Sequence, residues 1–229
     1  MFSQHFFDDR ERVAISLSAD IARRLAAAID ARGHATLVVS GGSSPLATLN
    51  ALAATDIDWS KVTVLASDER WVAEDDPSSN AGMIARELLR DKASDARFVS
   101  LYEPGMHADG AIQTIADRVS ALPLPFDYVL LGMGDDGHTA SLFPDDPDIE
   151  SALSSQEACI VAKPPSQPLQ RVSLTPNALL NAHAIGLLFF GQSKADVFAA
   201  ASVDGELKEF PVRSVLRQEI VPVSTYFAL

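Results

Sequence analysis

The stretch "ATLVVSGGSSPLATLNALAA" (residues 35–54) consists of an apolar run, a Gly/Ser turn and a segment with helical periodicity. The same order recurs in residues 61–72 followed by 78–93, in 126–138 and in 183–202. Apolar strands that alternate with helices are typical of a mainly parallel sheet covered on both faces. The sequence therefore predicts an α/β fold.

Two flanking segments extend this prediction. Residues 12–32 have the apolar periodicity of a surface helix, and Gly33 follows as a suitable C-terminal residue. The C-terminal "VSTYFAL" (223–229) predicts a last strand at a sheet edge. No repeat, low-complexity tract or long Gly/Ser linker divides the sequence, so we expect residues 1–229 to form one domain.

Composition excludes several classes of protein. With 47% hydrophobic and 21% charged residues, the chain has the composition of a soluble globular protein. It has no apolar run near the roughly 20 residues of a membrane-spanning helix, and its first residues do not resemble a secretion signal. A formal net charge of -13 argues against nucleic-acid binding, and the single Cys159 is compatible with a reducing compartment. We expect a cytoplasmic protein without nucleic-acid or membrane partners.

The turns that follow the four predicted strands read "SGGSS", "SDER", "GMGDDGH" and "GQSK". In parallel sheets, ligands bind beyond the carboxyl ends of the strands, so these turns should converge on one site. Arg70 and Lys194 lie in two of them, and Arg171 lies in "RVSLT". Such cations can form a basic pocket for a small anion within an acidic protein, although each could also be a surface charge.

In "LLGMGDDGHTASLFP" (130–144), Gly132, Gly134 and Gly137 have the G-x-G-x-x-G spacing of dinucleotide-binding turns. A nicotinamide site would need a long helix after the third glycine, which Pro144 and a further proline at position 147 would interrupt. We therefore expect no nucleotide cofactor.

The same stretch offers acid–base chemistry. An imidazole titrates near pH 6.5, so neutral His138 could take a proton from water, with Asp136 orienting its ring. The two side chains could equally cap a following helix.

Other chemistries are less well supported. "SGGSSP" (40–45) offers backbone N–H groups at a helix start that suit a phosphate, but it breaks the G-x-S-x-G pattern of serine hydrolases at Pro45. The chain has no G-x-x-x-x-G-K-[ST] loop. Its five histidines lack paired metal-ligand spacing, so we expect no metal.

Taken together, "VVSGGSSP", "SDERWV", "LLGMGDDGHTASLFP", "RVSLTPNALLNA" and "GQSKADVF" strongly resemble the 6-phosphogluconolactonase family, in that family's order and over nearly the whole chain. The resemblance implies a Rossmann-like three-layer α/β/α sandwich with a mainly parallel sheet, related to glucosamine-6-phosphate isomerase/deaminase. It also implies metal-free hydrolysis of 6-phospho-D-glucono-1,5-lactone to 6-phosphogluconate in the oxidative pentose phosphate pathway. The expected partner is thus a small sugar-phosphate lactone, and the expected state a monomer or weak homodimer.

The resemblance also implies roles for individual residues. His138 matches the base that activates water, and Asp136 its supporting carboxylate. Arg70 matches the active-site arginine of the "DER" motif, and Asp68 matches the acid that moves a proton in the deaminase relatives. The residues that match phosphate-binding positions are Gly41, Gly42, Ser43, Arg171 and Lys194.

Two other functions stay open. A glucosamine-6-phosphate deaminase would read like "DGHIAFNEP" in the histidine block, with a glutamate that assists sugar-ring opening, whereas this chain has Phe143 at the aligned position. A catalytically silent sugar-phosphate-binding regulator is the second alternative, against which the intact His138 and Asp136 argue.

Overall fold

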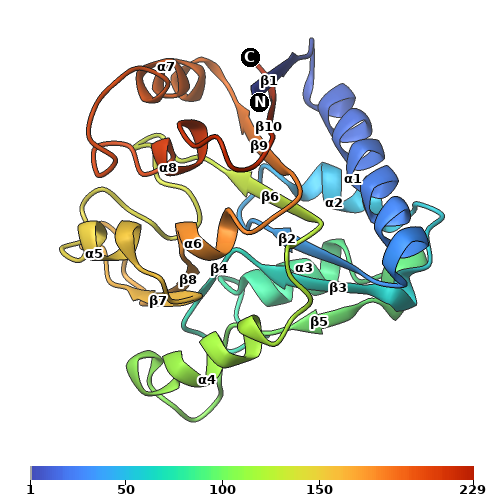
Figure 1. Cartoon of the computed structure of the whole chain (residues 1–229), viewed down its shortest axis with the longest axis horizontal. Helices are drawn as coiled ribbons and strands as arrows, with labels where there is room; N and C mark the ends of the chain where they lie inside the picture. Colours follow the sequence, from blue (N-terminus) through green and yellow to red (C-terminus); the bar gives the residue numbers. More distant parts are fainter. Residues whose placement is uncertain (1) are drawn as a thin grey trace.

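The computed structural model describes residues 2–229, and its main sheet has seven strands that all run parallel (Figure 1). Their order across the sheet is β1-β10-β9-β6-β2-β3-β5. The strands are Phe2–Phe6 (β1), Ala35–Val39 (β2), Val62–Ala66 (β3), Arg97–Val99 (β5), Tyr128–Gly132 (β6), Ile185–Phe190 (β9) and Val223–Ala228 (β10).

Helices lie on both sides of this sheet, so the predicted three-layer α/β arrangement is confirmed. Helices α1 and α2 lie together on one side, and α4 and α7 lie on the other (Figure 1). The helices are Arg10–Arg32 (α1), Leu46–Ala53 (α2), Asn80–Glu87 (α3), Ala108–Ser120 (α4), Ile149–Ser154 (α5), Pro176–Leu179 (α6), Gln192–Ala201 (α7) and Arg213–Leu216 (α8), with short 3-10 helices at Trp59–Lys61 (η1) and Asp91–Asp95 (η2). None of the helices within residues 2–229 is both long and apolar enough to cross a membrane.

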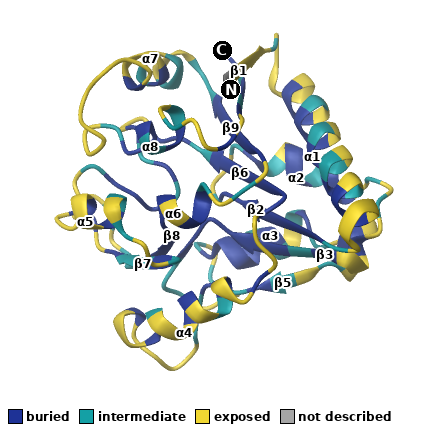
Figure 2. Cartoon of the chain, in the orientation of Figure 1, coloured by how far each residue is buried: buried dark blue, intermediate teal, exposed yellow. Residues whose placement is uncertain are grey.

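Burial explains why the strands read as continuous apolar runs. All five residues of β2 are buried, as are the first five of β9. A strand covered on both faces has no solvent side, so it lacks the alternation of polar and apolar residues that a half-exposed strand shows. Figure 2 shows this contrast, with the central strands mostly buried and the outer surfaces of α4 and α5 exposed.

Helix α1 confirms the prediction for residues 12–32, with two further residues at its start. The Asp9 side chain accepts a hydrogen bond from the Arg12 N–H at the N-terminus, and Gly33 ends the helix with a φ of 79°. Both ends therefore follow from local capping chemistry that the sequence displays.

A second sheet, of three antiparallel strands, was not predicted. It has the order β4-β8-β7 and consists of Asp68–Arg70 (β4), Arg171–Leu174 (β8) and Cys159–Ala162 (β7). The charged "DER" run is thus a strand, in which Asp68 pairs with Ser173 and Arg70 with Arg171. This small sheet sets two predicted cations side by side.

Two sequence-based expectations are wrong in detail. The C-terminal strand β10 is not an edge strand, because β1 pairs along its outer side. Polar residues interrupt the apolar ones in β1, FSQHF, so no apolar run in the sequence predicts this strand. The helix expected at 78–93 ends at Glu87, and a 3-10 segment follows in which Asp91 has a φ of 50°.

The four predicted strand-turn units correspond to β2, β3, β6 and β9, which are adjacent in the order β9-β6-β2-β3. Because these neighbours are parallel, their carboxyl ends meet at one rim of the sheet. The topology therefore brings the four turns together, as expected.

Candidate active site

One cleft of about 240 Å³ opens at this rim. It is lined by eight of the nine residues that the sequence singles out, namely Gly41, Gly42, Ser43, Asp68, Arg70, His138, Arg171 and Lys194. The ninth, Asp136, lies behind His138 and is hydrogen bonded to it. The structure thus gathers all nine residues, while their chemical roles stay predictions.

His138 is held by Asp136 at the end of the turn that follows β6. Its Nδ1 lies 2.6 Å from Oδ1 of Asp136, and its backbone N–H donates to the same oxygen at 3.1 Å. An ionised carboxylate can only accept, so Nδ1 carries the hydrogen and Nε2 of the neutral ring is the free proton acceptor. No long helix follows, so this pair is not a helix cap.

Asp136 stays ionised in this arrangement. Burial alone would raise the pKa of Asp136, but the hydrogen bond from His138, together with the charge of that ring when it is protonated, outweighs burial and holds that pKa below its ordinary value. A charged partner stabilises the imidazolium that forms when His138 takes a proton.

Two glycines allow the backbone to fold into the His138 turn, which we define as residues 132–138. A Cβ on Gly134 would overlap the His138 ring and crowd the Asp136 carboxylate. Gly137 has a φ of 77°, and a Cβ there would strike the ring of Phe210. The glycine spacing therefore serves to bring Asp136 and His138 together, and the segment after it contains no crossover helix for a dinucleotide.

Asp68 lines the same cleft and is almost fully buried. Its carboxylate accepts hydrogen bonds from Ser141 Oγ at 2.5 Å and Ser67 Oγ at 3.0 Å. Arg171 Nη1 lies 3.8 Å from the carboxylate, which makes a long ion pair. Desolvation lowers the pKa of Arg171 and the charge of Asp68 opposes that shift, so the buried guanidinium keeps its charge.

The remaining cations face the same cleft. Lys194 Nζ donates to the Met133 carbonyl at 2.7 Å, and Arg70 Nη1 donates to the Ser78 carbonyl at 2.5 Å. The side chains that line the cleft include three cations and one carboxylate, although the formal net charge of the chain is -13. The cleft is therefore a locally basic site that favours an anion.

Unpartnered donors give a second sign of ligand binding. Among the described residues, five buried side-chain polar atoms lack a hydrogen-bond partner, and three of them belong to cleft residues: Ser40 Oγ, Arg70 Nε and Arg171 Nε. Buried polar groups are almost always paired in folded proteins. Their concentration here favours a polar ligand that supplies the missing acceptors.

Among the residues that sequence reasoning did not single out, three polar ones stand out at the site: Ser40, Asn80 and Ser141. Ser40 directly precedes the glycine pair and was recognisable by that position, but Asn80 and Ser141 carried no such signal. Asn80 Nδ2 donates to the Asp68 carbonyl at 2.8 Å, and its amide fills the space that a Cβ on Gly41 would need. Ser141 belongs to the site through its hydrogen bond to Asp68, which lies 73 positions away in the sequence. Contacts of this range depend on the tertiary fold.

A metal has no built site in this region. Within residues 2–229, no group of three or more His, Cys, Asp or Glu side chains is arranged to hold a metal ion.

Fold and site together define an α/β protein with a cationic cleft at the carboxyl rim of a parallel sheet, beside a histidine–carboxylate pair. Residues 8–223 match the family of glucosamine-6-phosphate isomerases/6-phosphogluconolactonase, and the chain belongs to this family.

Its similar relatives point to one branch of that family. The chain is 47% identical to a 6-phosphogluconolactonase of Pseudomonas aeruginosa over 89% of this chain and 87% of the relative. It is 43% identical to that of Pseudomonas putida, over 94% and 90%. A crystal structure of a 6-phosphogluconolactonase from Shewanella baltica superimposes with a TM-score of 0.98 at 38% identity, covering 100% of this chain and 98% of that one.

Proposed function

We propose that this protein hydrolyses 6-phospho-D-glucono-1,5-lactone to 6-phosphogluconate, in the pentose phosphate pathway. One observation carries the mechanism: His138, fixed on Asp136, lines the same cleft as Arg70, Arg171 and Lys194. The relatives named 6-phosphogluconolactonase, similar over almost the full chain, support the substrate. The single, buried Cys159 supports a cytoplasmic setting.

The substrate phosphate binds at the Gly/Ser turn. The backbone of Gly41 to Ser43 and the side-chain cations of Arg171 and Lys194 surround it. Helix α2 begins directly after the Gly/Ser turn, and Lys194 lies in the first turn of α7. Anchoring the phosphate fixes the distant lactone carbon relative to His138. Orientation of this kind can supply much of the rate acceleration.

Hydrolysis then needs one base and no covalent intermediate. Nε2 of His138 takes a proton from water as its oxygen bonds to the lactone carbonyl carbon, and Asp136 stabilises the imidazolium. The bond from that carbon to the ring oxygen then breaks, and the imidazolium returns the proton to the leaving oxygen. Water is thus added across the ester, and every proton is accounted for.

The structure also bears on the deaminase alternative. Phe143 stacks on His138 with ring centroids 4.1 Å apart, so this face of the imidazole meets an apolar ring. Phenylalanine cannot transfer a proton to a sugar ring oxygen, which favours the lactonase over a glucosamine-6-phosphate deaminase.

Two assays test the proposal. Purified protein is given freshly made 6-phosphogluconolactone, with acid release measured against the spontaneous rate, and separately glucosamine 6-phosphate, with ammonia measured. We expect acceleration of the first reaction alone. Ammonia release without lactone hydrolysis would establish the deaminase, and inactivity in both assays would leave a sugar-phosphate-binding regulator.

The role of His138 is tested by His138→Ala. Loss of the base should lower kcat by about 10²–10⁴-fold while KM changes little, because the phosphate contacts remain. Turnover at the wild-type rate in that variant would remove His138 as the base.

A further inference from the structure

Phe143 contacts two residues that line the cleft, His138 and Arg171. Its ring stacks on the His138 imidazole, with centroids 4.1 Å apart and planes 26° from parallel. The guanidinium carbon of Arg171 lies 5.1 Å from the centroid of the same ring. One buried aromatic ring therefore touches both the proposed base and a proposed phosphate ligand.

The polar partners of His138 and Arg171 do not fully fix the orientation of the imidazole ring or of the guanidinium group. Asp136 holds His138 at Nδ1, in the plane of the imidazole, and leaves rotation about that bond open. Arg171 donates from Nη2 to Gln167 at 2.7 Å, but its ion pair with Asp68 is long and its Nε lacks a partner. Contact with a flat ring restrains both groups in the direction perpendicular to their planes.

The Phe143 ring is itself rigidly placed. It is 1% exposed, so the surrounding chain fixes its position. The loop before it is tied down at Ser141, whose N–H donates to Ser173 Oγ at 3.1 Å, and at Thr139, whose hydroxyl donates to the Gly132 carbonyl at 2.8 Å. These bonds connect the loop to both sheets.

We propose that Phe143 is a positioning residue that sets His138 and Arg171 at the spacing which the substrate requires between its lactone carbon and its phosphate. The inference rests on the proposed function, since it assigns these two residues to the two ends of one substrate. If Phe143 has this role, loss of its ring should lower kcat and raise KM together. Loss of His138 affects mainly kcat, and loss of Arg171 mainly KM.

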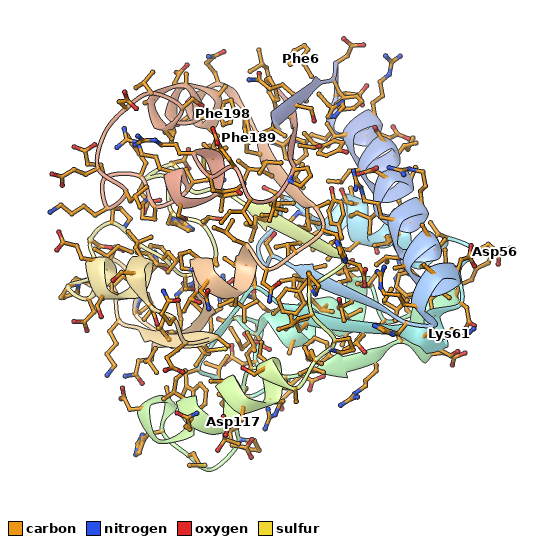
Figure 3. All side chains as sticks on the ribbon, in the orientation of Figure 1. Phe6, Asp56, Lys61, Asp117, Phe189 and Phe198 are labelled. Atoms are coloured by element: carbon orange, nitrogen blue, oxygen red, sulfur yellow. The ribbon has the colours of Figure 1, made fainter. Side chains whose placement is uncertain are left out.

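The test compares Phe143→Leu with Phe189→Leu. Phe189 of β9 is also fully buried, but its ring stacks on Phe198 of α7 and Phe227 of β10. Figure 3 shows Phe189 and Phe198 close together near α7. Both variants lose a buried ring and should unfold at lower temperature. Only Phe143→Leu should lower kcat and raise KM for 6-phosphogluconolactone, each by about tenfold, because displacements of an ångström at a reacting group are costly. Phe143→Met carries the same expectation if the leucine variant does not fold.

His138→Ala and Arg171→Ala, assayed beside them, separate the possible failures. If these two variants lose kcat and affinity respectively, while Phe143→Leu and Phe143→Met keep both constants within twofold of wild type, the positioning role is overturned and the proposed function stands. If His138→Ala keeps wild-type turnover, the proposed mechanism fails whatever Phe143 does. A Phe189→Leu variant with the same kinetic defects as Phe143→Leu would also overturn the inference.

Discussion

Gly134 shows how a single missing side chain shapes this site. Its backbone N–H donates to the His138 carbonyl at 2.9 Å, so the chain doubles back on itself within four residues. The imidazole then occupies the space in which any Cβ at position 134 would lie. The turn can therefore bring Asp136 and His138 together only with glycine at this position.

Gly134→Ala should therefore lower kcat/KM by about 10²-fold, because the new methyl group displaces the His138 ring from its productive position. Gly110→Ala is the matched control. Gly110 lies within helix α4, where a Cβ would meet only Met106 Cε at an ordinary 3.7 Å. That variant should gain about 0.5–1 kcal/mol of stability and keep its activity. Steady-state kinetics and urea unfolding of both variants check this, and unchanged kinetics in Gly134→Ala would contradict it.

Asp136→Asn tests the carboxylate that orients His138. We expect kcat to fall by about 10²–10⁴-fold, since an amide neither fixes the Nδ1–H tautomer nor stabilises the imidazolium. Because His138 depresses the pKa of Asp136, this group contributes stability above its unfolded pKa of about 3.9, and that contribution is lost as the pH falls through the folded pKa. Urea titrations of both proteins from pH 6 to pH 3 should show the stability difference shrinking in acid.

Strand β4 and helix α3 together connect the two sheets at the cleft. Glu69 of β4 accepts backbone N–H bonds from Asn80 at 2.7 Å and Ala81 at 2.6 Å, the first residues of α3. It also accepts from the Arg70 N–H at 2.7 Å. The carboxylate thus satisfies donors at the helix start that would otherwise be buried without partners.

Glu69→Gln should destabilise the protein by about 1–3 kcal/mol, because one carboxylate oxygen becomes an NH₂ group that faces N–H donors. Desolvation raises the pKa of Glu69 and outweighs the backbone hydrogen bonds, so its contribution to stability is complete below about pH 4.5 and declines as the pH rises through the folded pKa. The deficit of the variant should therefore be larger at pH 4 than at pH 8 in urea unfolding. Glu74→Gln, an exposed change in the following loop, should have no such effect.

The elements that the sequence predicts and those it does not differ in how they are stabilised. Strands β2, β3, β6 and β9 are covered on both faces and appear as apolar runs, and the caps of α1 are local. The sequence of β1, FSQHF, has no continuous apolar run, and β4 is three charged residues whose pairing with β8 bridges about a hundred positions. Pairing partners at such a distance leave no periodic signal in the chain. The nine site residues could be predicted because they lie in turns directly after strands or in recognisable motifs. Asn80 and Ser141 could not, because they act through tertiary contacts.

On the scale of the whole molecule, the cleft is a junction between two sheets. The seven-stranded sheet contributes the Gly/Ser turn, His138 and Lys194, while the small sheet contributes Asp68, Arg70 and Arg171. A ligand in this cleft binds both sheets at once. We therefore expect the small sheet to open only with the global unfolding of the chain, and substrate or product to protect both sheets equally.

Cys159 reports on this coupling because it is the only cysteine in the sequence and lies in β7 of the small sheet. Burial raises its pKa to about 12, so the reactive thiolate is scarce at pH 8 in the folded protein and plentiful in the unfolded chain, where thiols titrate near 8.5. Labelling by iodoacetamide in subdenaturing urea should follow the unfolded fraction measured by circular dichroism, and 6-phosphogluconate should slow it in proportion to its effect on global stability. Cys159→Ser should give no labelling. Labelling that runs ahead of global unfolding would show that the small sheet opens on its own, and the cleft would then lose Asp68, Arg70 and Arg171 while the main sheet remained folded.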